Sequence, residues 1–265
     1  MKLRLHSLLA IALSGMLIGC TSSIRSDIDN VSEVELHTKA QNELDNGNLK
    51  TSISVLEALD KSFPFGPYSQ QVQLDLIYAY YKSGDLPLAI ASIDRFLKLN
   101  PTHPNIDWVI YIRGLSNMAQ DDNTIQGWFN VDRSDRDAEF AKAAFKDFSY
   151  LVASFPSSYY TADAYKRLVY LKNRISRYQL KVAQFYTERG AYVAVINRVT
   201  KMLSMFPDTD STKQGLLLMH NAYNKLNLSD EAQKVDQLIQ ANLVNMPKEQ
   251  QKTFLSKFTS VFNGG

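Results

Sequence analysis

The sequence holds few of the residues that build covalent or metal-dependent sites. Cys20 is the only cysteine among 265 residues, so the chain forms no internal disulfide. No Cys/His metal spacing, P-loop or G-x-S-x-G nucleophile motif is present. The four histidines are far apart and outside any such motif: His6, His37, His103 and His220. We therefore expect neither an enzyme nor a bound cofactor or metal.

The chain also lacks a strong charge of one sign. Its 29 lysines and arginines nearly balance 27 aspartates and glutamates, which leaves a formal net charge of +2. A nucleic-acid-binding domain carries basic residues clustered on one face or along one helix. No such cluster stands out in the sequence, so we expect no nucleic-acid partner.

Beyond its first twenty residues the chain lacks a long apolar run. Lys2 and Arg4 precede an apolar stretch over residues 8–18, which leads directly into Gly19 and Cys20. This order is typical of a secretory signal peptide, and its apolar core is shorter than the ~20 residues of a membrane span. The sequence predicts a signal peptide over residues 1–19; an uncleaved membrane anchor is the alternative.

The cysteine that ends this segment predicts a lipid anchor. Leu-Ile-Gly-Cys at residues 17–20 resembles the lipobox of bacterial lipoproteins. The resemblance implies a diacylglycerol on the thiol, cleavage before Cys20 and acylation of the new amino group. Thr21 in the next position resembles an outer-membrane address, and residues 21–32 are polar, as in a flexible tether. We expect the lipid to be the only membrane attachment of a body that faces the periplasm.

Internal repeats organise the rest of the chain. Three glycine–proline pairs, each seventeen residues apart, occur in stretches with helical periodicity: Gly47 and Pro64, Gly84 and Pro101, and Gly190 and Pro207. Between them lie a small, a bulky and a packing residue in one register: Ser52, Leu56 and Leu59; Ala89, Ile93 and Phe96; Val195, Val199 and Met202. This pattern resembles the second half of a tetratricopeptide repeat. The glycine relieves the turn between two helices, and the proline ends the second helix.

The repeats predict an all-α fold, a tetratricopeptide-repeat solenoid of about five helix pairs. Two pairs are weaker, one around Gly114 with an insertion at 120–136 and one over residues 212–241. We expect about three N-terminal repeats over residues 33–156 and two C-terminal repeats over 157–241. Residues 160–189 form either one long helix or two abutting ones, and residues 242–265 form a tail.

Three surfaces are candidates for binding another protein. Tyr78 and Tyr81 fall on one side of a predicted helix with Gln70, whereas Tyr80 falls on the packing register. Tyrosine and glutamine suit an extended peptide, and ordinary repeat packing is the alternative. The second surface is the insertion, where Trp128 and Phe129 either pack back or form a contact. The third holds Arg189 and Arg198, for which surface solvation is the alternative.

Three segments carry a family resemblance: residues 63–119, 131–137 and 186–199. They resemble the BamD, or competence lipoprotein, family of outer-membrane assembly lipoproteins, and the similarity extends over most of residues 33–241. The resemblance implies a non-enzymatic subunit of the β-barrel assembly machine. It implies N-terminal repeats that hold a BamC-type lipoprotein and unfolded outer-membrane proteins. It also implies C-terminal repeats that dock the last POTRA domain of a BamA-type barrel subunit, through Arg189 and Arg198, and a BamE-type lipoprotein.

Two other functions are compatible with parts of this pattern. The competence name suggests a cell-wall-associated or DNA-uptake lipoprotein as the alternative. A lytic transglycosylase with a helical superhelix would need a lysozyme-like catalytic domain, and the residues after Ala241 are too few to form one.

Overall fold

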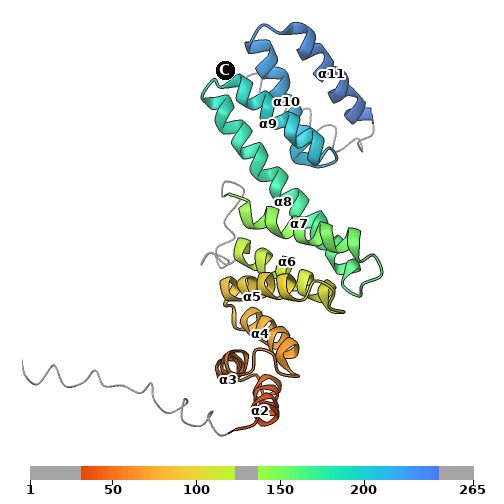
Figure 1. Ribbon diagram of the computed structural model, residues 1–265. Helices are drawn as coiled ribbons and strands as arrows, with labels where there is room; N and C mark the ends of the chain where they lie inside the picture. Colours follow the sequence, from red (N-terminus) through yellow and green to blue (C-terminus); the bar gives the residue numbers. More distant parts are fainter. Residues whose placement is uncertain (1–30, 123–136, 245–265) are drawn as a thin grey trace, which may run out of the picture. The chain divides into compact units, whose positions relative to one another are not determined.

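The computed structural model describes residues 31–122 and 137–244, and every regular element in these ranges is an α-helix. No described helix is long and apolar enough to span a membrane. The helices follow one another in five pairs along the chain (Figure 1): α2 Glu33–Asp45 and α3 Leu49–Ser62; α4 Ser69–Ser83 and α5 Leu86–Leu99; α6 Ile106–Asp122 and α7 Glu139–Ser154; α8 Thr161–Glu188 and α9 Tyr192–Met205; α10 Asp210–Lys225 and α11 Ser229–Val244. The predicted all-α class with five tetratricopeptide-type helix pairs is confirmed.

The internal contacts divide the chain after Asp85 into two compact units. In the first unit, α3 packs against both α2 and α4. In the second unit, each helix from α5 to α11 packs against the next, and α10 also packs against α8. Residues 161–188 form one continuous helix of 28 residues, which answers the question that the sequence left open.

The turns inside the helix pairs share one backbone geometry. Gly47, Gly84 and Gly190 have φ of 75°, 83° and 69°, the left-handed region that favours glycine. In each turn, the amide after the glycine donates to a carbonyl five residues earlier, as in the 2.9 Å bond from Asp85 to Tyr80. This is the Schellman cap of a helix C-terminus. The turn between α10 and α11 has the same geometry with Asn227 at φ 58°.

Proline turns connect one pair to the next. Phe63, Phe155 and Phe206 precede a proline, end their helices in similar non-helical conformations and donate to a carbonyl four residues earlier at 2.8 Å. A residue before proline is driven out of the helical region by the proline ring, so the helix ends there. The helix ends predicted at Pro64 and Pro207 are confirmed.

The packing register predicted from the repeats forms the core. Its nine residues are at most 1% exposed: Ser52, Leu56, Leu59, Ala89, Ile93, Phe96, Val195, Val199 and Met202. In the third pair, the ring of Phe148 on α7 lies where a side chain at Gly114 on α6 would be, 2.6 Å from an ideal Cβ. Phe148 therefore requires glycine at the crossing of these two helices.

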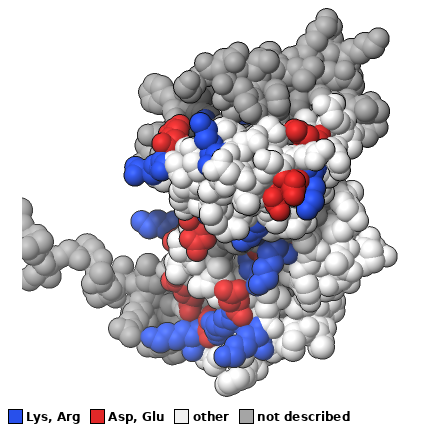
Figure 2. All heavy atoms as spheres, turned by 90° about the horizontal axis from the view of Figure 1, so that it is seen from above, with Lys and Arg blue, Asp and Glu red and all other residues white. Residues whose placement is uncertain are grey.

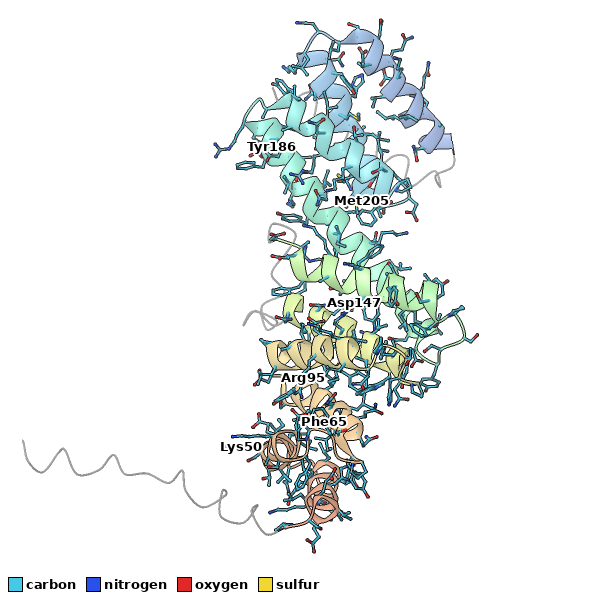
Figure 3. All side chains as sticks on the ribbon, viewed as in Figure 1. Lys50, Phe65, Arg95, Asp147, Tyr186 and Met205 are labelled. Carbon is cyan, nitrogen blue, oxygen red and sulfur yellow. The ribbon has the colours of Figure 1, made fainter. Side chains whose placement is uncertain are left out.

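A buried carboxylate connects the helices of the third pair. Asp147 on α7, labelled in Figure 3, accepts from Arg113 Nη2 at 2.8 Å and from Asn117 Nδ2 at 2.8 Å, both on α6. Burial raises the pKa of Asp147, and the Arg113 guanidinium opposes that shift. Arg113 also reaches Asp94 on α5 at 3.1 Å, so one arginine joins three helices.

Candidate protein-binding surfaces

The first candidate surface lies on α4. Gln70 and Tyr78 are exposed, and Tyr81 is half-buried. At 100° per residue, these three positions fall within about 80° of the helix circumference and extend over about three turns. Tyr78 is 40% exposed, and its ring lies 6.0 Å from the ammonium of Lys82. The three residues therefore form one elongated face that keeps an aromatic ring accessible.

Tyr80 between them belongs to the core, as the sequence predicted. It is 7% exposed, and its hydroxyl donates to Glu57 on α3 at 2.7 Å. Burial and the Glu57 carboxylate raise the pKa of Tyr80. Tyr80 thus fixes α4 on α3 and leaves its two tyrosine neighbours on the other side of the helix.

A buried aspartate borders this face, and sequence reasoning missed it. Asp75 accepts from Gln71 Nε2 at 2.8 Å and from the side-chain amide of Gln41 on α2. His37 lies 3.6 Å from the same carboxylate and stacks on Tyr68 with ring centroids 4.5 Å apart. Burial raises the pKa of Asp75, while Gln71, His37 and Gln41 oppose the shift. The amide nitrogens of Gln41 and Gln71 thus both donate to Asp75.

The third candidate surface holds two arginines, which lie in different surroundings. Arg189 follows the end of α8, is exposed, and holds its guanidinium 4.5 Å from the ring centre of Phe185. Arg198 lies in the middle of α9, is half-buried and donates from Nη1 to Gln179 Oε1 at 2.9 Å. The two arginines therefore lie in different surroundings, and a partner that contacts both must extend along α9.

Arg198 lines a pocket of about 300 Å³ between α7, α8 and α9. Lys142 and Lys146 on α7 and Lys201 on α9 are its other cationic residues. The apolar lining includes Ile175, Met202 and Phe206, each at most 2% exposed, and the more exposed Met205. Figure 3 shows Met205 at the end of α9 that is remote from Tyr186, which lies three residues before Arg189. The pocket therefore lies away from Arg189.

The charges elsewhere are mixed. Figure 2 shows acidic and basic side chains next to one another on the face in view. Within the described residues several ion pairs join opposite charges, among them Lys172 with Asp208 at 2.6 Å and His220 with Asp236 at 3.2 Å. The pocket, by contrast, has four cations and no acidic residue in its described lining.

Comparison with known proteins decides the family. A family model described as YfiO, outer membrane lipoprotein, matches residues 29–238. The chain belongs to the BamD family of outer membrane lipoproteins. The outer membrane protein assembly factor BamD of Vibrio cholerae is 48% identical over 238 residues, which cover 90% of this chain and 97% of that protein. The BamD of Pasteurella multocida is 42% identical over 239 residues, covering 90% and 92%.

Solved structures resemble the chain more weakly. The crystal structure of the MamA protein is 18% identical, covers 86% of this chain and 92% of its own, and has a TM-score of 0.38. At that score the likeness adds nothing to the fold described above.

Three residues that the sequence singled out lie outside the described ranges. They are Cys20, Trp128 and Phe129. The helix before the insertion is described up to Asp122, and near its end Asp121 forms a buried ion pair of 3.1 Å with Arg174 on α8. For a BamD-family chain, the lipid anchor and the role of the insertion therefore remain predictions from the sequence.

Proposed function

We propose that this chain is a subunit of the β-barrel assembly machine and takes part in the assembly and insertion of β-barrel proteins into the outer membrane. The observation that carries the proposal is the 48% identity to an outer membrane protein assembly factor over 90% of the chain. Similarity that extends over nearly the whole chain, and not over one repeat, favours a shared role.

The proposed role is that of a non-enzymatic scaffold. Helix pairs in series present extended surfaces for protein partners. Within the described ranges no group of histidines, cysteines and carboxylates is arranged to hold a metal ion. The candidate surfaces offer accessible aromatic rings and cations, which are common in protein interfaces. We assign no reaction to any of these residues.

The proposal assigns different partners to the two ends of the chain. The N-terminal repeats, over residues 33–156, would hold a BamC-type lipoprotein and an extended segment of an unfolded outer-membrane protein, with Gln70, Tyr78 and Tyr81 on the contact face. An unfolded barrel strand exposes unpaired backbone N–H and C=O groups, through which such chains aggregate. It therefore needs a soluble protein that binds it beside the membrane. The C-terminal repeats, over residues 157–241, would dock a BamA-type subunit at Arg189 and Arg198, and a BamE-type lipoprotein.

The membrane attachment in this proposal is the lipid on Cys20. It would hold the chain at the periplasmic side of the outer membrane, with residues 21–32 as a tether. A Cys20→Ala variant would then keep its helical circular dichroism spectrum and leave the outer-membrane fraction. If that variant stayed fully in the membrane fraction of cells without a BamA-type partner, the lipid assignment would be wrong.

Depletion in the native bacterium tests the proposed function. Loss of the chain should lower the amount of folded barrel proteins in the outer membrane, measured by heat-modifiable mobility on gels, and a plasmid copy should restore it. An unchanged amount of folded barrel proteins in the outer membrane would contradict the proposal. Co-sedimentation with peptidoglycan that persists without other assembly subunits would favour the cell-wall or DNA-uptake alternative.

A further inference from the structure

The pocket between α7, α8 and α9 combines an apolar interior with a rim of one charge. Lys142, Lys146, Arg198 and Lys201 line it, and none of its lining residues within the described ranges is acidic. We propose that this pocket receives one bulky apolar side chain of a partner protein, in a segment where carboxylates flank that side chain. The inference deepens the proposed function, because it states the chemistry of the docked segment.

The interior is shaped for an apolar anchor. Phe145 on α7 packs edge-on against Phe206 after α9, with ring centroids 5.6 Å apart, and closes one wall. Met202 is buried, whereas Met205 is 51% exposed. Unbranched, polarisable methionines adapt to an inserted side chain. A volume of about 300 Å³ lies at the lower end of ligand pockets and is large enough for one bulky side chain.

The cations are arranged to meet carboxylates around that anchor. Arg198 is held by its 2.9 Å bond to the buried Gln179, so its remaining N–H groups are pre-oriented. Lys142 lies 5.4 Å from the ring centre of Tyr178, and its contact with Asp137 is 3.5 Å long between two largely exposed groups. Such an exposed pair contributes little, so Lys142 exchanges it readily for a partner carboxylate.

Protein interfaces commonly combine a buried side chain with charged residues around it. A few side chains buried in central pockets dominate affinity, and charged residues at the rim contribute to association rate and partner choice. Nucleic acid is a poorer candidate, because it needs cations in a row along phosphates, whereas these four surround one apolar hollow.

The test uses the purified full chain in mild detergent and a defined probe. The probe is a fluorescein-labelled peptide with one phenylalanine between two pairs of glutamates, and its binding is measured by fluorescence anisotropy. One control peptide carries glutamine for every glutamate, and another carries alanine for phenylalanine. We expect the probe to bind at least tenfold more tightly than either control peptide.

Variants locate the binding in the pocket. Lys146→Glu with Lys201→Glu should weaken probe binding at least tenfold, and Met205→Ala should weaken it a few fold. The matched control is Lys225→Glu with Lys234→Glu, which makes the same charge change on exposed positions of α10 and α11 and should stay within twofold of the unmodified chain. Circular dichroism melting shows whether each variant is folded.

Several results would overturn the inference. They are equal binding of the glutamine peptide, equal binding of the alanine peptide, or full binding by the Lys146/Lys201 variant. Binding of dodecanoate without binding of the probe would assign the pocket to a lipid. If the probe fails and depletion still lowers barrel proteins, the pocket assignment falls and the proposed function stands.

Discussion

Arg198 on α9 donates a 2.9 Å hydrogen bond to the side-chain oxygen of Gln179 on α8, and Gln179 is itself 7% exposed. The bond fixes the arginine at the edge of an apolar pocket. Arg189 lies outside the pocket. It follows the end of α8, and its guanidinium lies over the ring of Phe185. The two arginines that the sequence grouped together therefore differ in how firmly they are held.

This difference gives expectations of different size for two charge reversals. Arg198→Glu should abolish co-purification of a BamA-type subunit in a detergent pull-down, because it places a carboxylate where we expect the partner's carboxylates. Arg189→Glu should reduce recovery only a few fold, because Arg189 is exposed and lies away from the pocket, whereas Arg198 is half-buried at its edge. Equal recovery with both variants would contradict this ranking.

The face of α4 that holds Gln70, Tyr78 and Tyr81 can be tested separately. Tyr78→Ala should weaken binding of a labelled peptide from an unfolded barrel protein and leave the melting temperature nearly unchanged, because Tyr78 is 40% exposed. The control is Tyr165→Ala on α8, a tyrosine that is 56% exposed and far along the chain from α4. If both variants bind the peptide alike, Tyr78 does not contribute to the face.

Two glycine-to-alanine changes separate crowding from helix propensity. An added Cβ at Gly114 lies 2.6 Å from the ring of the fully buried Phe148, whereas one at Gly215 lies 3.3 Å from Val199. Overpacking costs about 1–3 kcal/mol, and alanine gains roughly 1 kcal/mol in a helix. Urea unfolding should therefore show Gly114→Ala as the less stable variant. The reverse order would contradict the packing of α6 on α7.

The turn before α11 offers a stabilising change. Asn227 has φ 58° in the position that glycine occupies in the other turns of this kind. Asn227→Gly should raise the free energy of unfolding by a few tenths to about 1 kcal/mol, because glycine has no steric penalty there. The mirror change, Gly190→Asn, should lower it by a similar amount. A loss of stability in Asn227→Gly would show that the asparagine side chain stabilises the turn.

Asp75 gives a dependence on pH with a definite sign. Burial raises its pKa above the ordinary 3.8, so the folded chain holds this proton more tightly than the unfolded chain does. Its contribution to stability is full below pH 3.8 and is lost as pH rises through the higher folded pKa. The unfolding free energy of the unmodified chain, minus that of Asp75→Asn, should therefore fall from pH 3.5 upward in urea titrations. A difference that rises with pH would show the opposite shift.

The sequence predicted those parts of the fold that depend on neighbours along the chain. Turn glycines and helix-ending prolines act locally, so Gly84 and Pro101 were enough to place α5 between them. The sequence did not predict the left-handed turn at Asn227, because this turn holds asparagine where the other turns hold glycine.

The candidate sites were harder to predict, because they depend on residues far apart in the sequence. Lys142 and Lys201 come together only through the packing of α7, α8 and α9. The engagement of Gln41 by Asp75 likewise joins two helices that are not consecutive. An aspartate within the apolar stretch of α4 was the available signal, since a buried carboxylate needs partners.

The most direct test of the central claim is barrel folding by the reconstituted assembly machine. Proteoliposomes that hold the BamA-type subunit and its lipoprotein partners are given a urea-unfolded barrel protein, and heat-modifiable mobility measures the folded fraction over time. With this chain present, folding should be several times faster than without it, and the Arg198→Glu variant should restore little of the rate. Equal folding rates with and without the chain would contradict its role in outer-membrane protein assembly.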